Sequence, residues 1–165
     1  LKTKISTLNK NNIARASEMT LKTNQYNLRT ERYVLPDIEK IMKDKKYVGL
    51  LIGLKDIYAD HGNVGLVILK RIDKNTLFLD TFLMSCRVIG RYFETQIFSY
   101  IKEYALKNKY KSILGEFIDT KKNIVAKKLL EDHGFKKISH KTKKNSHMYS
   151  CKIKDIKQKN VDLYD

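Results

Sequence analysis

The segment that decides the fold is TLFLDTFLMSCRVIGRYFETQIFSY, residues 76–100. Its first nine residues are almost continuously apolar, which is typical of a central strand, because a strand covered on both faces has no polar side. From Phe93 onward, apolar residues recur at helical spacing and predict an amphipathic helix. The turn between strand and helix contains Arg87, Gly90 and Arg91.

This basic turn has two interpretations. A helix N-terminus offers free backbone N–H groups and a positive dipole end to phosphate. Gly90 allows close approach of the backbone, and Arg87 and Arg91 carry charges that can pair with phosphate oxygens. The same arrangement also arises by chance, as a tight turn that happens to be basic. The rest of the sequence has to decide between the two.

The flanking sequence predicts a mixed sheet in one domain. Periodicity and turn residues predict strands over 2–8, 47–58, 62–73, 76–84, 111–118, 135–144 and 147–154. They predict helices over 11–27, 36–46, 91–109 and 120–135. The order is β-α-α-β-β-β-α-β-α-β-β, an α/β (α+β) domain. We place the domain at residues 1–152 and a loose C-terminal tail at 153–165.

The net charge of the chain limits the classes of partner that it is expected to bind. Among its 165 residues, 34 Lys and Arg face 18 Asp and Glu, a formal net charge of +16. Such a charge attracts nucleic acid, anionic membrane surfaces, CoA phosphates or an acidic protein, or it is only the solvated surface of a lysine-rich protein. The five lysines between residues 136 and 144 have the same alternatives. No nucleic-acid-binding motif and no apolar run of membrane-spanning length is present, so we expect neither partner.

The cysteine and histidine content points to a reduced compartment. The two cysteines and four histidines have no spacing typical of metal ligands, so we expect no metal. Unpaired cysteines are typical of a cytoplasmic protein.

The basic turn and a later segment together resemble the GNAT acyltransferase superfamily. Arg87 and Gly90 match its [Q/R]xxGx[G/A] loop. Its NxxAxx…GF helix is matched by Asn123, Ala126, Gly134 and Phe135. The resemblance implies a GNAT fold, with a central mixed, mostly antiparallel sheet flanked by helices. It implies acyl-CoA, such as acetyl-CoA, or a carrier protein's phosphopantetheine as cofactor. The contacts it implies for that cofactor are Phe82, Leu83, Met84, Arg87, Val88, Ile89, Gly90, Arg91, Tyr92 and Asn123.

Three longer segments look like the C-terminal GNAT-like region of FkbH-like proteins. They are KTNQYNLRTERY (22–33), DTFLMSCRVIGR (80–91) and GEFIDTKKN (115–123). In those proteins this region follows a HAD-type phosphatase domain and serves polyketide or surface-polysaccharide pathways. The resemblance implies an acidic acyl carrier protein or a CoA thioester as partner. It also implies a HAD-type domain before Leu1, and the absence of an initiator Met fits a longer protein.

Two departures from the family leave two functions open. Tyr92 stands where the loop usually has a small residue, and Leu130 stands where many family members have a Tyr that donates a proton. The first function is acyl transfer. The second is a non-catalytic module that docks an acidic carrier protein for the HAD-type domain.

Polar residues near the expected cleft are candidates for its chemistry. Asp80 and Glu116, on the two flanking strands, are either the base that deprotonates the acceptor or structural carboxylates. Asn24, Gln25 and Asn27 follow the first predicted helix. They are either turn residues or, as the family motif favours, contacts for the acceptor substrate.

Overall fold

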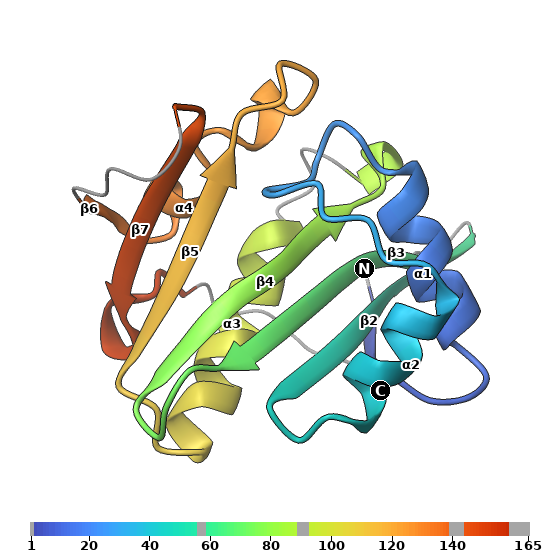
Figure 1. Ribbon diagram of the computed structural model, residues 1–165, viewed down its shortest axis with the longest axis horizontal. Helices are drawn as coiled ribbons and strands as arrows, with labels where there is room; N and C mark the ends of the chain where they lie inside the picture. Colours follow the sequence, from blue (N-terminus) through green and yellow to red (C-terminus); the bar gives the residue numbers. More distant parts are fainter. Residues whose placement is uncertain (1, 56–58, 89–92, 139–143, 159–165) are drawn as a thin grey trace.

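A computed structural model describes residues 2–55, 59–88, 93–138 and 144–158 (Figure 1). Its described residues form a seven-stranded sheet in the order β1-β2-β3-β4-β5-β7-β6. Every neighbouring pair is antiparallel except β4 and β5, which run parallel, so the expected mixed, mostly antiparallel sheet is confirmed. The strands are β1 (Lys2–Thr7), β2 (Tyr47–Lys55), β3 (Asp60–Arg71), β4 (Thr76–Met84), β5 (Ser112–Ile118), β6 (Lys136–Ile138) and β7 (Ser146–Lys152).

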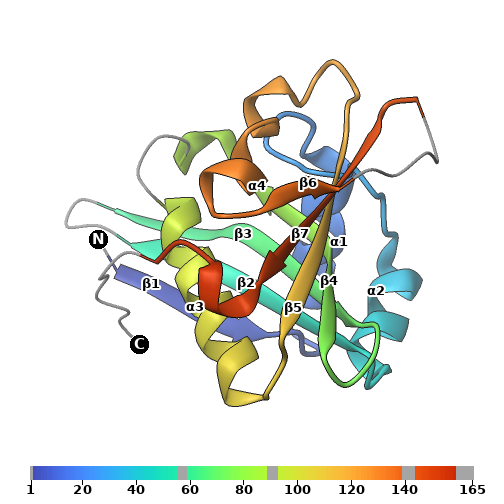
Figure 2. The same ribbon diagram turned by 90° about the vertical axis from the view of Figure 1, so that its left-hand side faces the viewer.

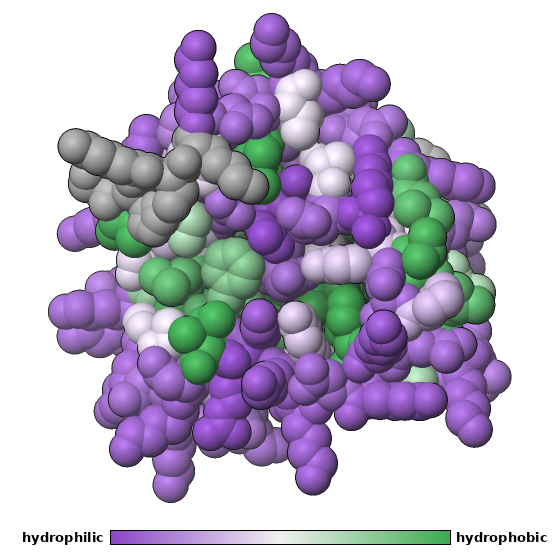
Figure 3. Space-filling model, viewed as in Figure 1, coloured by the Kyte–Doolittle hydropathy of each residue, from purple (hydrophilic) through white to green (hydrophobic). Residues whose placement is uncertain are grey.

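Helices cover both faces of the sheet (Figure 2). One face carries α1 (Ile13–Lys22) and α2 (Leu35–Lys43), and the other carries α3 (Phe93–Lys107) and the short α4 (Leu129–Asp132). Where α1 and α2 leave the first face open, the surface is mostly hydrophilic, with apolar side chains gathered over β5 and β7 (Figure 3). No helix in the described part of the chain is long and apolar enough to cross a bilayer.

The core explains the apolar strands. In β2, Leu50 and Ile52 pack with the residues of α3, while Leu51 between them packs with α1 and α2. In β4, Phe82 and Leu83 divide between the two sides in the same way. A strand buried on both faces is apolar throughout, so the prediction that 76–84 is a central strand is confirmed.

The helix predicted over 120–135 is wrong. The structure has a 3-10 turn (η2, Ile124–Ala126) followed by the four-residue α4. Lys121 has a φ of 69°, a left-handed backbone conformation that an α-helix cannot contain. Side chains hold this turn: Asp119 Oδ1 accepts from Lys121 N (2.8 Å), and Asn123 Oδ1 accepts from Thr120 N (3.0 Å). Such local bonds favour turns over helix.

Residues directly after 152 pack on the core. A 3-10 turn (η3, Ile153–Asp155) leads to Ile156, and both Ile153 and Ile156 are buried. The backbone N–H of Lys157 donates to the carbonyl of His133 (2.9 Å). The chain is therefore held to the domain as far as Lys157, and residues 159–165 of the expected tail lie outside the described residues.

Candidate functional site

The parallel strands β4 and β5 separate at their carboxyl ends. Their pairing runs from Thr76–Ser112 to Leu79–Gly115. Beyond it, residues 26–28 of the connection between α1 and α2 lie between the strands (Figure 1). We call residues 26–28 the wedge.

Backbone hydrogen bonds join the wedge to both strands. Leu28 N donates to Phe82 O (3.2 Å), Met84 N donates to Tyr26 O (2.9 Å), and Ile118 N donates to Leu28 O (2.9 Å). The side chains of Phe82 and Leu83 are fully buried. The positions of β4 expected to contact the cofactor, Phe82 to Met84, are therefore paired with a segment of the protein along part of this edge.

Two buried asparagines hold the wedge in place. Asn27 Nδ2 donates to Thr23 O (3.2 Å), and its Oδ1 accepts from Thr30 N (3.0 Å). Asn123 Nδ2 donates to Asn27 O (2.8 Å) and Ile118 O (2.9 Å). Buried amides need such partners. The structure thus gives Asn27 and Asn123 a role in the scaffold, whereas the sequence analysis expected contacts with acceptor and cofactor.

Asp80 and Glu116 lie on the adjacent strands β4 and β5, as predicted, and Arg29 joins them. Arg29 Nε donates to Glu116 Oε1 (2.9 Å), and Arg29 Nη1 lies 3.3 Å from Asp80 Oδ1. Asp80 Oδ2 accepts from the hydroxyls of Tyr33 (2.8 Å) and Thr81 (2.9 Å). The oxygens that a general base needs are thus occupied by donors of the protein itself.

Arg29 was missed by the sequence analysis. Its charged group also stacks over the ring of Phe78, 4.9 Å from the ring centroid. Arg29 is one of 34 basic residues, and its place in the segment KTNQYNLRTERY (22–33) is the sequence signal that could have found it. Its partners lie 51 and 87 residues away in the sequence.

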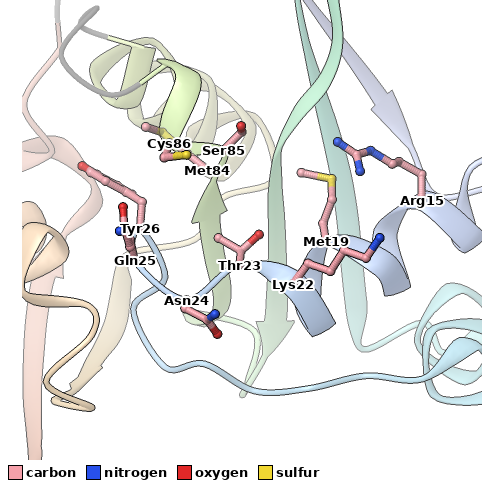
Figure 4. Close-up of a pocket in the computed structure, with 10 residues that line it drawn as sticks. All are labelled: Arg15, Met19, Lys22, Thr23, Asn24, Gln25, Tyr26, Met84, Ser85 and Cys86. Atoms are coloured by element: carbon pink, nitrogen blue, oxygen red, sulfur yellow. The ribbon is translucent and has the colours of Figure 1, made fainter.

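A cavity of about 390 Å³ lies between α1, the segment that leads from α1 into the wedge, and the end of β4 (Figure 4). It brings together Asn24 and Gln25, expected at the acceptor, and Met84, expected at the cofactor. The helix α1 also contributes to the lining, which no sequence motif predicted. The lining residues are Arg15, Met19, Lys22, Thr23, Asn24, Gln25, Tyr26, Met84, Ser85 and Cys86.

The expected phosphate turn begins at this cavity. β4 ends at Met84, a 3-10 turn (η1, Cys86–Val88) follows, and α3 begins at Phe93. The strand, turn and helix therefore occur in the predicted order, and Val88 is buried. Some of the residues expected to bind phosphate in this turn lie outside the part of the chain that the structure describes. They are Ile89, Gly90, Arg91, Tyr92 and the side chain of Arg87.

The groups behind the wedge are polar but buried. Burial, and then the charges of Glu94 and Asp132, raise the pKa of Tyr26 well above its ordinary range. The Nδ1–H of His133 donates to Leu129 O (2.8 Å), its Nε2 accepts from the Thr95 hydroxyl (3.0 Å), and burial lowers its pKa. Tyr26 is thus a buried residue in the wall of the cavity, and its hydroxyl stays protonated at neutral pH.

Leu130 packs against the strand β5. Leu130, at the position where the family often has a tyrosine, is buried and lies over Gly115, where an added Cβ would meet its side chain at 3.0 Å. Across the described ranges, no three His, Cys, Asp or Glu side chains gather in a way that could hold a metal ion.

No family model matches the sequence, and no curated protein matches it. Solved structures do match it. The ribosomal-protein-S18-alanine N-acetyltransferase of Escherichia coli is 11% identical with a TM-score of 0.69, covering 98% of this chain and 99% of that one. The GNAT domain of PAT from S. lividans is 12% identical with a TM-score of 0.70, covering 91% of this chain and 90% of that one.

A third match is the spermidine N-acetyltransferase of Vibrio cholerae in complex with CoA and spermine. It is 14% identical with a TM-score of 0.71, covering 93% of this chain and 97% of that one. At these identities the likeness concerns the fold alone. The chain has the α+β GNAT fold, as predicted.

Proposed function

We propose that this chain is an acyltransferase that uses an acyl-CoA thioester. The observation that carries the proposal is the cavity at the end of β4. There Met84 and the start of the basic turn meet Asn24 and Gln25, the residues expected at the acceptor. The Vibrio cholerae structure with the same fold contains CoA, which supports the choice of cofactor.

In this proposal, the residues around the cavity bind and orient the reactants. The backbone N–H groups of the turn 87–92 and the charges of Arg87 and Arg91 bind the pyrophosphate at the start of α3. Asn24 and Gln25 orient the acceptor for direct attack on the thioester carbonyl, without a covalent enzyme intermediate. Asp80 or Glu116 acts as base only when Arg29 releases one of them.

The donor can also be a thioester on the phosphopantetheine of an acyl carrier protein. The reacting group is the same, and a net charge of +16 favours an acidic carrier. We extend the proposal to a cytoplasmic polyketide or surface-polysaccharide pathway with a HAD-type domain before Leu1, as the FkbH-like resemblance implies.

The second candidate is a non-catalytic module that docks an acidic carrier protein for the HAD-type domain. The specific observation in its favour is the wedge, which pairs with Phe82 and Met84 on the strand edge expected to contact the cofactor. The hydrogen bonds from Arg29 to both carboxylates and the buried Leu130 point in the same direction.

Calorimetric titration with CoA and with acetyl-CoA tests the proposal. We expect binding of both by the wild type and its loss in the double variant Arg87→Ala/Gly90→Trp. Arg71→Ala is the matched control, because it also removes one positive charge but lies at the far end of β3. No binding of either compound by the wild type would overturn the acyl-CoA proposal, and titration with a phosphopantetheinylated carrier protein would then test the docking module.

A further inference from the structure

The cavity at the end of β4 has an uneven distribution of charge. Two of its ten lining side chains, Arg15 and Lys22, are cationic, and none is a carboxylate. The carboxylate beside them is Glu18, whose Oε1 lies 2.5 Å from Arg15 Nη1 and whose Oε2 lies 3.8 Å from Lys22 Nζ. One carboxylate thus faces two cations, which leaves positive charge at the rim.

Lys22 is available to a ligand. Its side chain is 76% exposed, and a pair at 3.8 Å between exposed groups is weak, because water screens it. Arg15 is held more firmly, since its Nη2 also donates to Asn63 O (2.9 Å). The Lys22 ammonium is therefore the cation that is free to pair with a ligand, and the charge of Arg15 adds to the positive potential of the cavity.

The orientation of Asn24 follows from Arg32. Arg32 Nη2 contacts Asn24 Oδ1, and Arg32 Nη1 donates to the carbonyl of Thr23 (3.1 Å) at the end of α1. A guanidinium has donors only, so the oxygen of the Asn24 amide must face it. The Nδ2 hydrogens of Asn24 are then turned away from Arg32 as donors.

The exposed lining thus includes the Lys22 ammonium and the Asn24 amide, whose hydrogens are not used by Arg32, while buried Met19 and Met84 form an apolar part of the lining. Donors without a carboxylate suit an anionic group and repel a cation. We propose that the acceptor carries a carboxylate or phosphate group, which binds at Lys22 and Asn24. That the bound molecule is the acyl acceptor rests on the proposed function, whereas the binding of an anion at this cavity does not.

Cys86 allows a test without turnover, because it is an exposed thiol that lines the same cavity. The test measures its rates of alkylation by iodoacetate, which is anionic, and by iodoacetamide, which is neutral and of similar size. Peptide mapping by mass spectrometry reports Cys86 separately from the buried Cys151. The ratio of the two rates is compared with the ratio for a short unstructured cysteine peptide.

We expect the ratio to be roughly three- to fivefold higher in the protein than in the peptide, because the local charge attracts the anionic reagent. Lys22→Glu should abolish this excess, and Asn24→Asp should reduce it while keeping an oxygen towards Arg32. Lys40→Glu on α2 is the matched control for net charge and should leave the ratio unchanged. A ratio equal to that of the peptide, or an equal fall in Lys40→Glu, would overturn the proposal.

Protection of Cys86 from iodoacetamide identifies the group that binds. We expect phosphoethanolamine or β-alanine to slow alkylation, and ethanolamine and spermidine to leave it unchanged. Whichever acid protects distinguishes phosphate from carboxylate, and protection by spermidine or ethanolamine as strong as by the acids would overturn the proposal. No CoA is present in these measurements, so their failure is distinct from a failure of the CoA titration.

Discussion

The stretch TNQYNLR, residues 23–29, divides into an outer half and an inner half that differ in what their polar groups bind. Asn24 and Gln25 are exposed at the cavity. Asn27 is buried with its amide bonded to backbone groups, and Arg29 bonds to two carboxylates. Neighbouring residues of one motif therefore line a cavity on one side and hold the scaffold together on the other.

The largest expected effect is the removal of Arg29 from the inner half. Arg29→Met leaves Asp80 and Glu116 without their cation in a largely buried place, and we expect a loss of about 3–5 kcal/mol in the free energy of unfolding. Arg15→Met breaks an ion pair whose side chains are 37% and 45% exposed, and should cost less than about 1 kcal/mol. Urea unfolding measures both, and equal losses would contradict the contrast between the two sides.

The two cysteines sharpen the same contrast. Burial raises the pKa of Cys151 from 9.0 to about 11, whereas Cys86 is exposed at the cavity. Two units of pKa reduce the thiolate fraction of Cys151 at neutral pH roughly 100-fold. Iodoacetamide should therefore label Cys86 first in the native protein and both residues at similar rates in denaturant. Rapid labelling of Cys151 in the native protein would contradict this and would show that β7 opens to the reagent.

The asparagines give an intermediate effect. Asn123→Ala removes three hydrogen bonds inside the scaffold and leaves buried backbone groups without partners, at a cost of about 2–3 kcal/mol. Asn24→Ala, at the exposed rim, should change stability by less than about 0.5 kcal/mol. Chemical denaturation compares them. If Asn24→Ala were as costly as Asn123→Ala, Asn24 would belong to the scaffold.

The smallest effect is a dependence of stability on pH. Burial lowers the pKa of His133 below 6.5, so the folded protein binds a proton less readily than the unfolded chain. Its contribution to stability is complete above pH 6.5 and decreases as the pH falls below that value. Unfolding free energies between pH 5 and 8 should show a shallower acid decline in His133→Gln than in the wild type. Identical slopes would mean that another group titrates.

Local pattern was sufficient for most of the fold. The strand 76–84, the turn after it and the helix that follows were predicted because their apolar periodicity changes from continuous to helical at one place. The helix over 120–135 failed, since a turn with Lys121 in a left-handed conformation, held by the side chains of Asp119 and Asn123, competes with it. Periodicity does not detect this competition.

The candidate site was predicted only in part. Asn24, Gln25 and Met84 all line the cavity, but Arg15 lies outside the quoted segments and Lys22 is only the first residue of one of them. The exposed face of α1 lines a cavity only because the end of β4 packs beside it. The two segments are more than 60 residues apart in the sequence, so local patterns do not predict that they meet.

The sequence by itself determined the class of fold, the central position of β4 and the basic turn before α3, because each depends on neighbours within a few residues. Only the tertiary structure decided which polar residues face the cavity and which hold the wedge. Arg29 meets Asp80 and Glu116 across 51 and 87 residues. Whether a buried side chain is a reactive group or a structural one depends on which partners satisfy it, and those partners come together only when the sheet is assembled.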